Sequence, residues 1–312
     1  MEPQMAMTEA AQQFGRSVAP PSIPYRVLSA TWKFLRRKPL GAFGAAITLM
    51  LILTALFADS IAQYDPLEQS QRTALIAPNS VYWAGTDQFG RDVFSRLVYG
   101  ARISLFVGVF AVMLGLIPGT ALGVLSAYLG GTFDYLVQRV VDAIQAVPGI
   151  ILLIAIMVVL GARFPNVPAQ VIVVIALAIP NAISESRVLR GASMQVARSE
   201  YVMAARAVGA TDVRVMLKHV LPNITSPIII LASLAFGQFI LAEATLSFLG
   251  FGIQAPAPSW GNMLSAEGRA YMFAAPWLLW GPAIALSLVV FGANMFGDAL
   301  RDVLDPRLKG SR

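Results

Sequence analysis

The chain has 312 residues, of which 57% are hydrophobic and only 13% are charged, with a formal net charge of +6. Soluble domains carry about 25% charged residues, so this composition predicts an integral membrane protein. Cysteine is absent and histidine occurs once, which excludes disulfides and leaves no Cys/His or multi-His constellation for a metal or catalytic site, and no cofactor is expected. No basic-aromatic pattern points to nucleic acid.

Six runs free of Asp, Glu, Lys and Arg are long enough to cross a membrane, since about 20 apolar residues span the hydrocarbon core. They are 39–58, 103–133, 143–162, 164–184, 220–242 and 270–297. The first run is too long for the apolar part of a cleaved signal peptide, the alternative interpretation, so we expect it to be retained. The sequence thus predicts an all-α polytopic membrane protein with six transmembrane helices.

The distribution of basic residues predicts the orientation, because cytoplasmic loops near span ends hold an excess of lysine and arginine. An N-terminus inside the cell places most of the 23 basic residues in the cytoplasm, with both termini and segment 199–222. The expected organisation is a tail with an interfacial helix (1–38), a first span (39–58), an external segment (59–101), a five-helix core (102–298) holding a cytoplasmic loop (190–222), and a C-terminal tail (299–312).

The external segment contains glycines and charged residues at close spacing. This spacing predicts a tight, hydrogen-bonded loop rather than a phosphate cradle. The run closely resembles the Gly-Thr-Asp…Gly-Arg-Asp…Ser-Arg signature of dipeptide/oligopeptide/nickel permeases. The resemblance implies a loop that helps to gate the pathway or to dock a binding protein, and the alternative is a role in loop folding alone. The candidate residues are Gly85, Thr86, Asp87, Gly90, Arg91, Asp92, Ser95 and Arg96.

The third span begins with an amphipathic segment, in which Arg139 and Asp142 lie three residues apart and can pair on one helical face. Pro148 and Gly149 follow, and they predict a kink.

A polar, basic island at 199–223 separates the fourth and fifth apolar runs. Ser199 is expected to cap a short helix, and Gly209 to close it in the left-handed conformation. A second helix should start at Thr211 or Asp212 and end at Pro222, which lacks an N–H. The pattern predicts a compact helical knob with a tight corner.

This island resembles the "EAA" coupling loop of the membrane subunits of binding-protein-dependent ABC importers, in which the loop's helix sits in a groove of a separate ATPase subunit. One departure is Met203, where the family usually has glutamate. The alternative is an ordinary helical hairpin between two spans. The residues that the resemblance assigns to coupling are Glu200, Met203, Ala204, Ala205, Arg206, Gly209, Arg214, Leu221 and Pro222.

Glu243 is an acidic residue flanked by long apolar runs. An ionisable residue at membrane depth points to a function, here in the solute pathway. Alternatively, Glu243 lies near the outer interface and pairs with an arginine. The segments 247–264 and 294–307 also resemble the permease family, so the resemblance covers about residues 30–310 in the family's order.

The resemblance implies a type I ABC importer permease in the cell inner membrane, which forms a heterodimer with a second permease subunit. This dimer would work with two cytoplasmic ATP-binding subunits and an extracytoplasmic solute-binding protein. No lysine follows a glycine, so the chain lacks a Gly-Lys-Ser/Thr phosphate loop and is not expected to be an enzyme. Peptides are the expected solutes, with nickel or another small solute as the alternative. An ion-driven secondary transporter and an intramembrane enzyme are less well supported, because the spans lack repeated carboxylates and a nucleophile-base pair.

Overall fold

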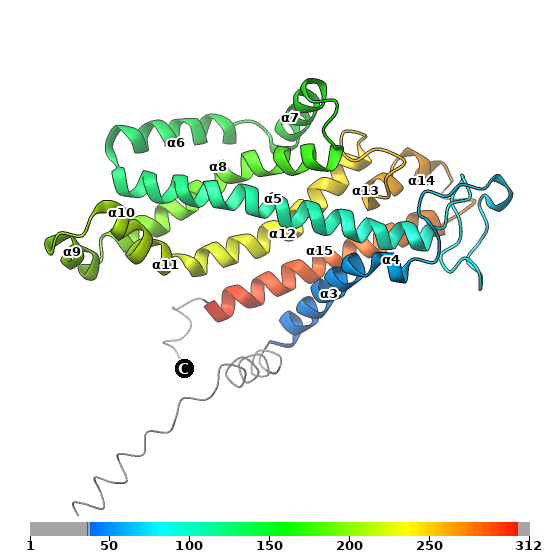
Figure 1. The fold of residues 1–312 in the computed structure, drawn as a ribbon, viewed down its shortest axis with the longest axis horizontal. Coiled ribbons are helices and arrows are strands. Elements are labelled where there is room, and N and C mark those ends of the chain that lie inside the picture. The colour runs from blue at the N-terminus through cyan, green and yellow to red at the C-terminus, as the bar shows by residue number, and fades with distance from the viewer. Residues whose placement is uncertain (1–35, 37, 272, 305–312) are drawn as a thin grey trace, which may run out of the picture.

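The computed structural model describes residues 36, 38–271 and 273–304, which contain helices and connecting loops but no strand. Most of the long helices run along the long axis of the molecule (Figure 1). The helices are α3 (Pro39–Leu56), α4 (Ala58–Ile61), α5 (Val93–Leu129), α6 (Gly131–Gln145), α7 (Gly149–Arg163), α8 (Ala169–Ala197), α9 (Glu200–Ala207), α10 (Asp212–Val215), α11 (Leu221–Asn223), α12 (Thr225–Phe248), α13 (Trp260–Met263), α14 (Ala266–Ala270) and α15 (Trp277–Leu304), with a 3₁₀ turn at Gln71–Thr73 and a π-helical turn at Met216–Val220.

Five of the described helices are long and apolar enough to cross a membrane, namely α3, α5, α8, α12 and α15. A sixth span is present if α6 and α7 count as one, although they are bent by 94°. The sequence predicts a kink at Pro148 and Gly149. The structure has a bend at this place, but the bend is much sharper than the predicted kink. Pro148 has an extended backbone with ψ of 127° and precedes the first turn of α7, so the helix restarts in a new direction.

Helices α5 and α8 pack against each other in the centre of the bundle. Small residues at their contact let the two backbones come close together. A Cβ on Gly119 would lie 2.7 Å from the carbonyl oxygen of Ala182, and one on Gly123 would lie 2.7 Å from that of Ser186. Gly44 of α3 approaches Gly292 of α15 in the same way. Substitution at these glycines would push the helices apart.

Several helices extend beyond the predicted apolar runs because their charged residues have partners. α5 begins at Val93 rather than at residue 103, since the Asp92 carboxylate accepts a hydrogen bond from the Ser95 N–H at 2.8 Å and caps the helix. α8 continues to Ala197 rather than ending at 184, because Arg187 and Arg190 bind carboxylates of α6. Apart from residues 36 and 38, the N-terminal tail with its predicted interfacial helix lies outside the described residues, as does the C-terminal tail from residue 305.

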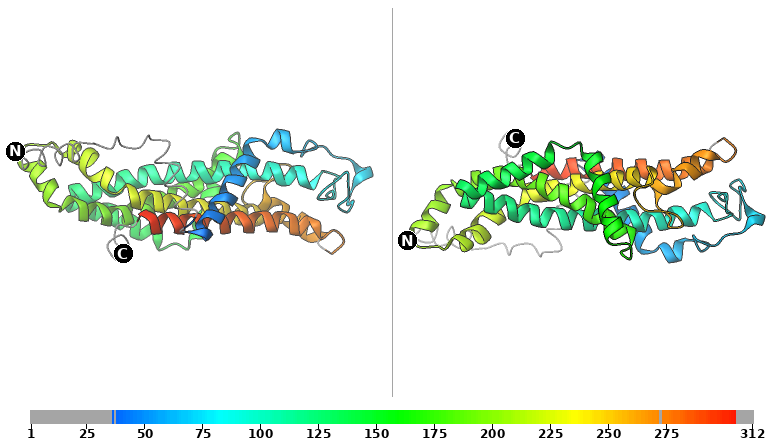
Figure 2. Two further views of the ribbon diagram at one scale, coloured as in Figure 1. Left: turned by 90° about the horizontal axis from the view of Figure 1, so that it is seen from below. Right: turned by 90° about the horizontal axis from the view of Figure 1, so that it is seen from above.

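The molecule has two distinct ends. At one end, residues 199–224 form a helical knob of α9, α10 and α11, which we call the knob (Figure 1). At the other end lie residues 62–92, 249–271 and 273–276, which include α13 and α14 and which we call the loop end. Figure 2 shows the same separation of the two ends in two further views.

Candidate functional site

The knob has the two-helix shape and the glycine corner that the sequence predicts. Gly209 has a φ of +86°, and no atom lies within 4 Å of where its Cβ would be, so the backbone conformation alone favours glycine here. Ser199 precedes α9, but its hydroxyl donates to the carbonyl of Val196 at 2.7 Å instead of accepting from α9. The predicted side-chain cap is therefore wrong, because Ser199 bonds back to the end of α8.

The second helix of the knob does not end at Pro222 as predicted. It passes through the π-helical turn and α11, with Pro222 in the first turn of α11, and Ile224 separates it from α12. Proline cannot donate a hydrogen bond, and its ring clashes with the carbonyl four residues before it. Widening the preceding turn from α to π relieves this conflict without ending the helix.

Apolar packing holds the knob against the ends of α5 and α8. Val202, Val215 and Val220 are fully buried and form one cluster with Ile224 and with Val124 of α5. One face of the knob is therefore part of the protein core, which leaves the other face to be presented outward.

The outward face carries most of the residues that the resemblance assigns to coupling. Ala205 and Leu221 are half-buried, and the exposed members are Glu200, Met203, Ala204, Arg206, Gly209, Arg214 and Pro222. Val208, which the sequence analysis did not single out, is 87% exposed at the corner. An apolar side chain this exposed beside a glycine corner suits contact with another protein.

Arg206 is partly engaged within the chain. Its guanidinium lies 4.5 Å from the ring centre of Tyr128, at the end of α5, and the Tyr128 hydroxyl donates to Asp212 at 2.6 Å. Tyr128 thus joins both knob helices to α5. Nothing in the local sequence around Tyr128 reveals this contact, because its partners are distant in the chain.

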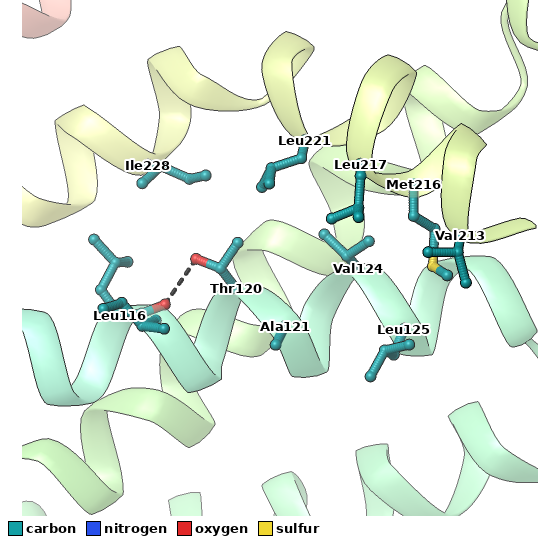
Figure 3. A pocket seen from close by; sticks show the side chains of 11 residues that line it. Leu116, Thr120, Ala121, Val124, Leu125, Val213, Met216, Leu217, Leu221 and Ile228 are labelled. Atoms are coloured by element: carbon teal, nitrogen blue, oxygen red, sulfur yellow. Dashed lines mark hydrogen bonds between the residues drawn. The ribbon is translucent and has the colours of Figure 1, made fainter.

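An apolar groove of about 540 Å³ separates the knob from part of α5 (Figure 3). Thr120 and Val124 of α5 face Leu217 and Leu221 of the knob across it. The knob therefore contacts α5 at Val124 and Tyr128 and is separated from α5 along the groove.

The loop at 85–96 is tight and hydrogen-bonded, as the sequence predicts. Gly85 and Gly90 have positive φ, and a bridge joins Thr86 to Asp92. The Asp87 carboxylate accepts from the Arg91 backbone N–H at 3.0 Å and from the Arg91 guanidinium at 2.6 Å. These polar side chains are buried, so the loop is rigid.

Two further contacts connect this loop with the rest of the loop end. Arg96 donates to the carbonyls of Pro66 and Pro256 and lies 3.6 Å from the Asp87 carboxylate. Trp277 at the start of α15 donates to the carbonyl of Thr86 at 3.1 Å. The candidate loop residues therefore fix the shape of the loop end, and the surface around them is formed by exposed side chains such as Trp83 and Phe89.

Glu243 lies wholly inside the chain and is 0% exposed. Its Oε1 accepts from the hydroxyls of Ser247 at 2.8 Å and Ser259 at 2.6 Å. These partners are serines, not the arginine of the alternative interpretation. Ser259 follows the loop that contains Pro256 and Pro258, so Glu243 connects that loop with α12.

These features define a class of protein. A helical chain with five or six candidate membrane spans, a helical knob at one end and hydrogen-bonded loops at the other belongs to the class of multi-pass membrane proteins.

Comparison with known sequences identifies the family. Residues 119–310 match the family described as "Binding-protein-dependent transport system inner membrane component", and residues 28–78 match "N-terminal TM domain of oligopeptide transport permease C". The chain belongs to the binding-protein-dependent transport system inner membrane component family. It is an inner-membrane permease subunit of an ABC importer, and such subunits are not enzymes, since ATP hydrolysis belongs to separate subunits.

Two relatives cover almost the whole chain. The dipeptide transport system permease protein DppC of Alkalihalophilus pseudofirmus is 42% identical over 93% of this chain and 94% of its own length. The glutathione transport system permease protein GsiD of Escherichia coli is 41% identical over 89% of this chain and 90% of its own. Among solved structures, an inward-facing form of the MetNI methionine ABC transporter matches with a TM-score of 0.56 and 18% identity, over 67% of this chain and 96% of that one. That likeness supports the fold.

Proposed function

We propose that the chain forms half of the solute pathway of a peptide importer, paired with a second, similar permease subunit. Two ATP-binding subunits would act at the knob end, in the cytoplasm, and a solute-binding protein at the loop end. The exposed knob with its glycine corner is the observation that carries this proposal. The two relatives described above are named for a dipeptide and for glutathione, which are both short peptides.

The knob is suited to transmit movement because its inner face is packed and its outer face is open. Ala204 and Gly209 give the outward surface small side chains that admit close approach of a partner, while Glu200 and Arg214 offer charges on the same surface. Met203 is 55% exposed where the family usually has glutamate, so this contact to the ATPase is apolar here. Val208 adds a second apolar contact.

At the loop end, the buried ion pairs act as a frame for the exposed side chains. Trp83, Phe89 and Val81 are exposed around that frame. A rigid apolar surface of this kind suits docking of the solute-binding protein, because little conformational entropy is lost when it is covered. Arg96, which bonds to the carbonyls of Pro66 and Pro256, would connect the docked binding protein with the loop before α13.

Reconstitution tests the proposal directly. The chain is purified with the products of its neighbouring genes, placed in liposomes and supplied with the binding protein and ATP. We expect ATP-dependent uptake of a labelled dipeptide that a protonophore does not inhibit. Uptake driven by an ion gradient without ATP would contradict the importer. Uptake of nickel without uptake of peptide would show that the solute is nickel, and it would still support the importer function.

A further inference from the structure

The apolar groove between the knob and α5 has two facing walls (Figure 3). One wall is the side of α5 between Leu116 and Leu125, and the other is formed by α10, the π-helical turn and α11, with Ile228 of α12. The hydroxyl of Thr120 on α5 donates to the carbonyl of Leu116 at 2.7 Å, so this polar group is already satisfied within the helix. The groove therefore offers an apolar lining to whatever fills it.

The groove is open along one side, because several of its lining side chains are exposed. Ile117 of α5 is 65% exposed, and Val213 and Leu217 of the knob are each 59% exposed. Together they border a volume of about 540 Å³ that the side chains of this chain leave unfilled. Apolar surface of this extent is unfavourable in water, so an apolar group is expected to cover it.

The level of the groove in the membrane follows from its position along α5. The charge-free run of α5 begins after Arg102, which pairs with Asp59. At 1.5 Å per residue, Leu116 lies about 21 Å and Leu125 about 35 Å from Arg102 along the helix. Since the hydrocarbon core is about 30 Å thick, the groove begins inside the core and ends at its boundary on the knob side. Acyl chains are found at the level of its first part, and lipid headgroups at the level of its last part.

Basic side chains border the groove at the headgroup level. Arg214 and Lys218 directly follow the groove residues Val213 and Leu217, and both are exposed. Among the described residues, no carboxylate forms an ion pair with either of them. Asp212 is the acidic residue of the same segment, and its carboxylate accepts the Tyr128 hydroxyl at 2.6 Å. With two cations and one carboxylate, this border of the groove has a net positive charge.

We infer that the groove binds a lipid with a negatively charged headgroup, from the leaflet at the knob end. The acyl chain fills the apolar groove, and the phosphate accepts hydrogen bonds from Arg214 and Lys218. A zwitterionic lipid binds less well, because its own ammonium group is repelled by the two cations. The bound lipid packs the knob on α5 where the side chains of the protein leave a gap. This lipid site does not depend on which solute the protein carries.

Photo-crosslinking in the complete complex identifies the occupant of the groove. Benzoylphenylalanine is introduced in place of Ala121, an exposed residue that lines the groove, and separately in place of Ala46, an exposed residue of α3 outside it. We call these the groove position and the control position. The complex is placed in vesicles of phosphatidylethanolamine with a minor fraction of phosphatidylglycerol, and the adducts formed on illumination are identified by mass.

The measured quantity is the ratio of phosphatidylglycerol to phosphatidylethanolamine adducts at each position. A lysine or arginine near the membrane surface increases the affinity for anionic lipid about fivefold, so the ratio at the groove position should exceed that at the control position by about fivefold or more. Equal ratios at the two positions, or lipid adducts at the control position alone, would overturn the inference. An adduct between the groove position and the second permease subunit would also overturn it, because a protein helix would then fill the groove.

Replacement of the two cations tests their role in choosing the headgroup. Arg214→Gln combined with Lys218→Gln should reduce the ratio at the groove position to that at the control position. The matched control is Arg301→Gln combined with Lys38→Gln, which removes the same two charges from α15 and from the residue before α3. It should leave the enrichment unchanged. An enrichment that persists without Arg214 and Lys218 would contradict the assigned headgroup contacts.

Discussion

Gly209 is the residue on which the shape of the knob depends most. A non-glycine residue in its left-handed conformation costs about 1–2 kcal/mol, and more for a β-branched side chain. Because space is open around it, Gly209→Val should distort the corner without a clash in the core. We expect uptake to fall while ATP hydrolysis by the complex persists, as measured by the ratio of solute moved to ATP consumed.

Two variants make this prediction specific. Gly191→Val places the same side chain in equally open space within α8, where φ is not positive, and should leave the ratio unchanged. Gly209→Asn should have a smaller effect than valine, since asparagine tolerates the left-handed region. Normal uptake by Gly209→Val would show that the corner is not part of coupling.

Asp87 holds the outer loop through a buried ion pair. Asp87→Ala removes a carboxylate that lies 2.6 Å from the buried guanidinium of Arg91, and the loss of one partner of a buried pair costs about 3–5 kcal/mol. We expect a marked decrease in the thermal stability of the detergent-solubilised protein. A variant as stable as the parent would mean that the loop is not held by this pair.

The matched control is Asp59→Asn, which breaks an exposed pair with Arg102. The hydrogen bond from the Arg102 guanidinium holds the pKa of Asp59 below its usual range, so the pair is formed at neutral pH and its contribution disappears as the pH falls through that lowered pKa. Because both groups are exposed to solvent, this variant should not change the stability measurably.

Glu243 acts as an acceptor for two buried hydroxyls. Glu243→Gln keeps an oxygen that can accept from Ser247 and Ser259, so it should fold and transport nearly normally. Glu243→Leu leaves both hydroxyls without that acceptor, at about 1–3 kcal/mol each, and should loosen the loop before α13. Proteolysis from the loop end measures this difference. Equal resistance of the two variants would contradict the anchoring role.

At the scale of elements, the position of α6 depends on its ion pairs with α8. Asp134 accepts from Arg190 and from Ser126 of α5, so it joins three helices. Asp134→Ala should release the start of α6, detectable as faster hydrogen exchange there. In a double-mutant cycle with Arg190→Ala, we expect a coupling of about 1–3 kcal/mol. A coupling near zero would show that apolar packing alone holds α6.

The sequence predicts elements well where a local pattern decides the structure. The apolar runs identify the long helices, and Gly209 and the pair of Arg139 and Asp142 are where the spacing predicts them. Helix ends are predicted poorly, because α5 starts at the Asp92 cap and α8 continues past Arg187 and Arg190, whose partners lie on α6. The sharp bend before α7 and the contact of Trp277 with Thr86 depend on the same long-range packing, which no local pattern contains.

At the scale of the whole molecule, the chain is a subunit whose two ends are prepared for different partners. The knob offers small, apolar and charged groups on one open face, and the loop end offers a rigid surface around buried ion pairs. Beside the knob, an apolar groove lies open along α5. Each of these surfaces makes physical sense only when another protein, lipid or solute covers it.

Co-purification tests the central claim most directly. A tagged form of the chain is expressed with its native neighbours and extracted in mild detergent, and the bound proteins are identified while ATPase activity is measured. The account predicts recovery of a second permease subunit and nucleotide-binding subunits with ATPase activity, and loss of the nucleotide-binding subunits when the exposed Val208 is replaced by aspartate. Isolation of the chain alone, without ATPase activity, under conditions that preserve known complexes of this kind would contradict it.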